Sequence, residues 1–140
     1  MLPTDAVPLV FALLPDSPGF DELYARAVSA ACADAGVRCE RVDQQLFDET
    51  TLARVYSRIT SADLVIADMS GHDPNVFYET GFAHAVGKVV ILLARDARDI
   101  PFDLQHYPHI IYDGQIEPLR TELTRRVKWF LDQPLAARPR

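Results

Sequence analysis

Several features that mark common protein classes are absent from this 140-residue sequence. Its two cysteines, Cys32 and Cys39, are too few for a disulfide framework and lack the paired CxxC spacing of a zinc site. No apolar run approaches the ~20 residues of a membrane-spanning helix. The first residues lack the basic and apolar regions of a signal peptide. We therefore expect a cytoplasmic protein with reduced thiols and no membrane partner.

Positive charge is also scarce, since the net charge is −6 and the pI is about 5.1. A nucleic-acid polymer is therefore not an expected partner, because such proteins present a basic face. Neither a P-loop nor a GxGxxG motif occurs, which argues against an ATPase or a dinucleotide oxidoreductase. The four histidines are scattered and form no HExxH pattern, so we predict neither a metal site nor a cofactor.

Apolar runs and amphipathic segments alternate along the chain in the manner of an α/β protein. Continuous apolar runs suit parallel strands that are covered on both faces. We predict one domain over residues 1–140, with its core at 7–131, as a flavodoxin-like three-layer sandwich whose five-stranded parallel sheet has the order 2-1-3-4-5. The expected strands are 7–14, 37–42, 64–67, 89–93 and 108–112; the expected helices are 20–34, 50–61, 74–86 and 115–131; and 43–49 is an expected polar loop.

The strand order predicts where a ligand would bind. In open parallel sheets, ligands bind beyond the carboxyl ends of the strands, at the point where the strand order reverses. Here that point lies between the first and third strands. The loops 14–20 and 68–75 follow these strands and are rich in Asp, Ser, Pro and Gly. We expect a pocket between them, with Glu79 at its floor.

Glu79 is a charge in an otherwise apolar helix. Asp73 can cap this helix, Pro74 suits its first position and Gly87 closes it. No lysine or arginine lies three or four residues from Glu79, which helical spacing places in one stripe with Val76, Ala83 and Val86. One interpretation is a partly exposed or structural carboxylate. The other is a catalytic carboxylate with a raised pKa in a cleft.

The residues around this predicted pocket suit the chemistry of an N-glycosidic bond. Cleavage builds positive charge on the sugar, which a carboxylate such as Glu79 can stabilise or attack. We expect the neighbouring polar groups to hold the sugar and any phosphate, and an aromatic ring to stack on the base. The candidates are Asp16 and Asp68 for ribose hydroxyls, Ser17, Ser70, Gly71 and Asn75 for phosphate, and Phe20, Tyr24, Phe77 and Tyr78 for stacking unless they only fill the core.

The stretches ADLVIAD at 62–68 and PNVFYETGFA at 74–83, with Gly87 and Lys88, resemble the nucleoside 2-deoxyribosyltransferase-like superfamily. They are also similar to bacterial TIR-like nucleotide-binding domains, whose N-V-x-x-E-x-G stretch corresponds to 75–81 here. The resemblance implies that Glu79 is the nucleophile or the oxocarbenium stabiliser. It also implies that Asp73 helps to bind substrate, although an acidic side chain there would repel a 5′-phosphate.

The resemblance leaves the activity open between several outcomes. It implies a nucleoside, a nucleotide or NAD as substrate, and hydrolysis or transfer as the reaction. A homo-oligomer in which two subunits complete one site is consistent with it. The alternative is a non-catalytic nucleotide sensor or a TIR-like assembly module. A phospho-acceptor receiver domain is rejected, because the acidic pair and the lysine that it needs are not present in the right places.

Overall fold

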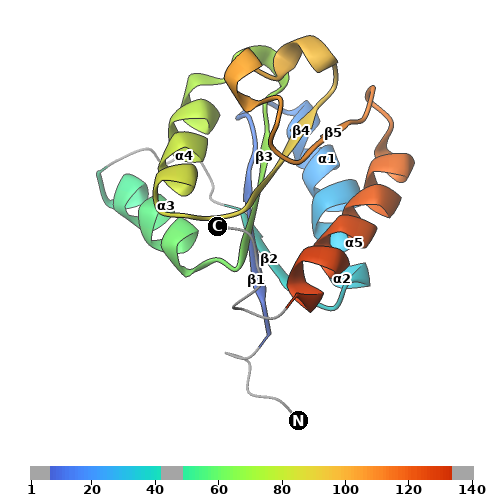
Figure 1. Ribbon diagram of the computed structural model, residues 1–140, viewed down its shortest axis with the longest axis horizontal. Helices are drawn as coiled ribbons and strands as arrows, with labels where there is room; N and C mark the ends of the chain where they lie inside the picture. Colours follow the sequence, from blue (N-terminus) through green and yellow to red (C-terminus); the bar gives the residue numbers. More distant parts are fainter. Residues whose placement is uncertain (1–6, 42–48, 134–140) are drawn as a thin grey trace.

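The computed structural model describes residues 7–41 and 49–133 and contains one sheet between two layers of helices (Figure 1). All strand pairs are parallel and the strand order is β2-β1-β3-β4-β5, which confirms the prediction. The three inner strands are buried along their whole length, as expected of apolar runs without alternation. The strands are β1 (Leu9–Leu13), β2 (Arg38–Arg41), β3 (Leu64–Asp68), β4 (Val90–Ala94) and β5 (His109–Ile111).

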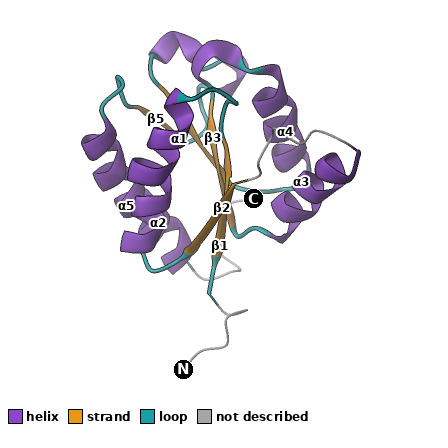
Figure 2. Cartoon of the chain, turned by 180° about the vertical axis from the view of Figure 1, so that it is seen from behind, coloured by secondary structure: helices purple, strands orange, loops and turns teal. Residues whose placement is uncertain are grey.

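The helices cover both faces of the sheet, which confirms the three-layer sandwich (Figure 2). On one face lie α3 (Glu49–Ser61) and α4 (Pro74–Ala85), and on the other lies α5 (Ile116–Asp132) beside the helical stretch 19–34. That stretch consists of α1 (Gly19–Leu23), the π-helical turn η2 (Tyr24–Val28) and α2 (Ser29–Asp34). Three 3₁₀ turns complete the fold: η3 (Ser70–His72), η4 (Ala97–Asp99) and η5 (Phe102–Leu104).

The π-helical turn changes which residues of the first helical stretch face the sheet. A regular helical period over 20–34 predicts an inner face of Leu23, Ala27, Ala30 and Ala31, and Leu23, Ala27 and Ala31 are buried. Ala30, also predicted to face inward, is only partly buried, while Val28 and Cys32 are fully buried. A turn closed by i→i+5 hydrogen bonds holds more residues than an α-helical turn, so it rotates the positions that follow. A strict 3.6-residue period misses that rotation.

The end of α4 also differs from the prediction by one residue, with a consequence for the apolar stripe. The helix ends at Ala85, and Val86 is 43% exposed, so its placement in the buried stripe was wrong. Gly87 follows with φ of +82°, a conformation that glycine adopts without strain. The Lys88 N–H then donates to the Ala83 carbonyl oxygen at 2.9 Å, which closes the helix as glycine at this position usually does.

The remaining element boundaries agree with the prediction to within two residues. A regular helical period over 50–61 predicts an inner face of Leu52, Val55, Tyr56 and Ile59. In α3, Val55 and Ile59 are buried, whereas Leu52 and Tyr56 are partly buried. The predicted polar loop 43–49 lies outside the described residues, except that α3 already includes Glu49. Within residues 7–41 and 49–133, none of the helices combines the length and the hydrophobicity needed to cross a bilayer.

Candidate active site

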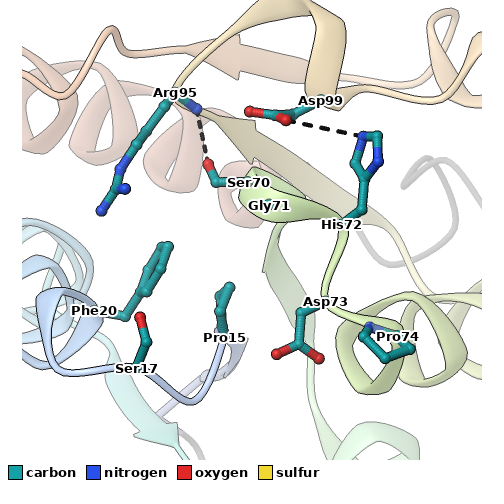
Figure 3. A pocket seen from close by; sticks show the side chains of 10 residues that line it. All are labelled: Pro15, Ser17, Phe20, Ser70, Gly71, His72, Asp73, Pro74, Arg95 and Asp99. Carbon is teal, nitrogen blue, oxygen red and sulfur yellow. Dashed lines mark hydrogen bonds and ion pairs between the residues drawn. The ribbon is translucent and has the colours of Figure 1, made fainter.

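A cavity of about 560 Å³ opens at the carboxyl edge of the sheet (Figure 3). Its walls come from the loops that follow β1, β3 and β4, so it lies next to the predicted reversal of strand order and extends towards β4. A volume of this size is typical of small-molecule sites. The residues that line it are Pro15, Ser17, Phe20, Ser70, Gly71, His72, Asp73, Pro74, Arg95 and Asp99.

A second cavity, of about 250 Å³, lies near the opposite, amino-terminal end of β4. Its lining is mainly apolar and aromatic, and includes Tyr107, Trp129 and Phe130. Parallel sheets place ligands at the carboxyl ends of their strands. The larger and more polar cavity is therefore the candidate active site.

The structure brings only some of the predicted site residues to this cavity. Those that line it are Ser17, Phe20, Ser70, Gly71 and Asp73. Those that are not among the lining residues are Asp16, Asp68, Asn75, Glu79 and the aromatic candidates Tyr24, Phe77 and Tyr78. Sequence reasoning missed Arg95 and Asp99, because the predicted pocket comprised only the loops after the first and third strands. The third wall of the cavity is the loop that follows β4. Because β4 pairs in parallel with β3, the carboxyl ends of both strands lie at the same edge of the sheet.

Asp68 lies at the end of β3 and is fully buried. Its Oδ1 accepts a hydrogen bond from the Ser70 N–H at 2.8 Å, and its Oδ2 accepts one from the Tyr112 hydroxyl at 2.7 Å. The Ser70 Oγ in turn accepts from the Arg95 N–H at 2.9 Å. Burial raises the pKa of Asp68, although these hydrogen bonds oppose the rise. Asp68 therefore fixes the loop that presents Ser70 to the cavity.

The hydrogen bond from Tyr112 to Asp68 gives the first prediction. Tyr112→Phe removes the donor and leaves a buried carboxylate oxygen without it, so we expect the free energy of unfolding to fall by about 1–3 kcal/mol. Tyr78→Phe is the matched control, because the Tyr78 side chain is 64% exposed. Urea unfolding of both variants is the measurement. Equal, small effects would mean that the buried bond does not hold this loop.

The loop after β3 turns sharply before α4 begins. Gly71 has φ of +72° and His72 has φ of +54°, and the second value is costly for a residue with a side chain. The His72 ring packs at 5.4 Å from the Phe77 ring, and its Nε2 lies 3.8 Å from Asp99 Oδ1. This backbone places the imidazole on the cavity wall, where it can serve as a proton donor.

Asp73 ends the turn and caps α4, as the sequence predicted. Its Oδ1 accepts hydrogen bonds from the Asn75 N–H at 2.9 Å and the Val76 N–H at 3.3 Å, and Pro74 occupies the first helical position. The backbone N–H of Asn75 is thus used inside the protein, and its side chain is exposed away from the cavity lining. The cap fixes where α4 starts and therefore where Glu79 lies.

Glu79 is 2% exposed and packs on the sheet-facing side of α4, together with Val76 and Ala83. Its Oε2 is buried without a hydrogen-bond partner among the residues that the structure describes. Burial, and secondarily the charge of Asp73, raises the pKa of Glu79 to about 7. The expectation that Glu79 forms the cavity floor is not met, because Glu79 is not among the residues that line the cavity.

The influence of Asp73 on Glu79 can be tested separately from the cap. Asp73→Asn keeps a side-chain oxygen that caps the helix but removes the like charge. We therefore expect the pKa of Glu79 to fall towards its ordinary value while α4 stays intact. The measurement is an NMR titration of the Glu79 side-chain carboxyl carbon. An unchanged midpoint would mean that burial alone sets this pKa.

No cluster of His, Cys, Asp and Glu side chains suited to a metal ion occurs in the part of the chain that the structure describes. The side chains that line the cavity offer carboxylates, hydroxyls, an imidazole and a guanidinium. A carboxylate with a pKa near 7 is present in both its protonated and its ionised form at neutral pH.

Comparison with known proteins identifies one family. The model of the family described as nucleoside 2-deoxyribosyltransferase matches residues 20–123, which include the whole cavity except Pro15 and Ser17. No curated protein matches the sequence closely enough to count as a relative.

Solved structures share the fold at low sequence identity. A 2-deoxyribosyltransferase from the psychrotolerant bacterium Bacillus psychrosaccharolyticus matches with a TM-score of 0.59 and 12% identity, over 94% of this chain and 98% of that one. The CMP N-glycosidase BcmB of Clostridium botulinum matches at 0.55 and 21%, over 87% and 99%. A 2-desoxiribosyltransferase from Leishmania mexicana matches at 0.55 and 22%, over 64% of this chain and 65% of that one, just under two thirds of its length.

Proposed function

Because this chain belongs to the nucleoside 2-deoxyribosyltransferase family, we propose that it cleaves or transfers the N-glycosidic bond of a nucleoside or nucleotide, with Glu79 as nucleophile. One observation carries the role of Glu79. It is a buried carboxylate whose Oε2 has no hydrogen-bond partner among the described residues, with a pKa raised to about 7, in the second turn of α4, the helix whose first residue lines the cavity. Keeping such a group buried lowers the stability of the fold. Carboxylates with strongly raised pKa values are concentrated at functional sites, which is why we assign Glu79 to the reaction.

In the proposed reaction, the ionised Glu79 attacks the anomeric carbon of the sugar. The electron pair of the C–N bond leaves with the base, which takes a proton from His72 or from water. The resulting glycosyl ester is then cleaved by water, or by a second base that accepts the sugar. Because Glu79 is buried and is not among the lining residues, this step requires its side chain to turn from the buried position into the cavity.

The proposed substrate contacts follow from which side chains line the cavity. Ser17 and Ser70 offer hydroxyls, Phe20 offers a ring face and Asp73 offers a carboxylate. Asp68 acts through Ser70 and Tyr112, because its own oxygens already accept hydrogen bonds from them. Asp16 and Asn75 are exposed outside the lining, so they would contact only a substrate that extends beyond the cavity.

The experiment that tests this function is incubation of the protein with a panel of nucleosides, nucleotides and NAD, followed by chromatography for free base. We expect base release from at least one nucleoside or nucleotide. NAD is included because it tests the TIR-like resemblance, which stays a prediction. A repeat at several protein concentrations tests whether two subunits complete one site, since activity would then rise more steeply than protein concentration.

A second candidate is a nucleotide sensor that binds without turnover. The burial of Glu79 favours it, because a side chain that is 2% exposed does not touch a ligand in the cavity unless it moves. This candidate predicts ligand binding with no base release by either the parent or a Glu79 variant. Base release from any member of the panel would exclude it.

A further inference from the structure

The cavity contains an arginine that sequence reasoning did not consider. Arg95 directly follows β4, and its N–H donates to the Ser70 hydroxyl, so the two loops are joined at this point. Its guanidinium carbon lies 4.8 Å from the centre of the Phe20 ring, a cation–π contact that orients the charged group. Arg95 is exposed, and its guanidinium takes part in none of the ion pairs found among the side chains that the structure describes.

The charges of the cavity are separated between its two sides. In Figure 3, the guanidinium of Arg95 extends over Phe20 and Ser17, whereas Asp73, His72 and Asp99 lie on the other side. The capping role of Asp73 and the pairing of Asp99 with His72 keep both carboxylates on that side. A substrate with one strongly anionic end is therefore attracted to the Arg95 side and repelled from the Asp73 side.

We propose that Arg95 binds the phosphate of a nucleoside 5′-monophosphate, with Ser17 beside it, so that phosphorylated nucleosides are the preferred substrates. Arginine suits this role, because its planar fork donates two parallel hydrogen bonds to phosphate oxygens. The carboxylate of Asp73 would repel a phosphate at the start of α4. The positive charge of Arg95 can instead bind the phosphate on the opposite side of the cavity. This inference rests on the proposed function and adds a substrate class to it.

The test compares a nucleoside with its own 5′-monophosphate, using a base that the panel shows to be released. We expect a higher kcat/KM for the monophosphate. Arg95→Ala should reduce the ratio of the two kcat/KM values by about 10- to 100-fold, as expected when a charge-assisted contact is lost. Arg95→Lys keeps the charge and should restore part of the ratio. Arg98→Ala is the control, because Arg98 lies outside the cavity and pairs with Asp96.

Calorimetric titration of the same two ligands with each variant gives a readout that does not need turnover. Weaker binding of the monophosphate by Arg95→Ala, with the Arg98→Ala value unchanged, supports the contact of Arg95 with the phosphate independently of turnover. Thermal unfolding establishes that the variants are folded. A nucleoside preferred over its monophosphate, or a ratio that Arg95→Ala does not change, would overturn the inference while leaving the proposed function standing. Absence of base release would instead contradict the proposed function.

Discussion

Glu79→Gln is expected to reduce kcat for base release by roughly 10³-fold or more, because the amide cannot form the glycosyl ester. Glutamine has nearly the same shape, so the packing of α4 against the sheet should persist. Binding of the substrate should change much less than turnover, since the cavity-lining side chains are untouched. The measurement is single-turnover base release together with calorimetric binding.

The matched control for this variant is Glu22→Gln, which also neutralises one glutamate. Glu22 is exposed, pairs with Arg26 on the surface of the first helical stretch and is not among the residues that line the cavity. We expect its turnover to equal that of the parent. Base release by Glu79→Gln at the parent rate would show that Glu79 is not the nucleophile.

The stability of the protein is expected to fall with rising pH because of Glu79. Its pKa is raised to about 7 in the folded protein from an ordinary value of 4.5, so the folded state binds the proton more tightly than the unfolded chain. The stabilisation is complete below the unfolded pKa and is lost as the pH rises through the folded pKa. Between pH 4 and pH 8 the loss amounts to about 3 kcal/mol, since one pKa unit corresponds to about 1.4 kcal/mol.

Glu79→Gln isolates this contribution, because all other titrating groups are common to both proteins. Urea unfolding at pH 4 and pH 8 should show a larger fall in the free energy of unfolding for the parent than for the variant. The variant should consequently gain stability relative to the parent as the pH rises, at the cost of turnover. A difference between the two proteins that is the same at both pH values would mean that Glu79 titrates normally.

The fold was predictable because its main signals are local in the sequence. The apolar runs that became β1, β3 and β4 and the cap formed by Asp73 and Pro74 each act over a few residues. The parallel strand order then follows from the alternation of strands and helices. The π-helical turn was not predictable from a regular period, because its effect on Val28 and Cys32 depends on packing against the sheet.

The site was predictable only in part, because several of its contacts join residues that lie far apart in the sequence. The burial of Glu79 could be expected from its apolar neighbours on α4, and it is observed. Asp68 was expected to face a ligand, yet its oxygens accept hydrogen bonds from Tyr112, 44 residues away, and from Ser70. Arg95 was missed, because nothing near it in the sequence marks the Phe20 ring that orients it. Long-range contacts of this kind leave no periodic signal.

The most direct test of the central claim is rapid quenching of the enzyme during turnover, followed by mass spectrometry of its peptides. The account predicts a peptide that carries the sugar as an ester on Glu79, and no such adduct in Glu79→Gln. Turnover with the sugar attached to another carboxylate, such as Asp73, or with no adduct at any time point, would contradict it.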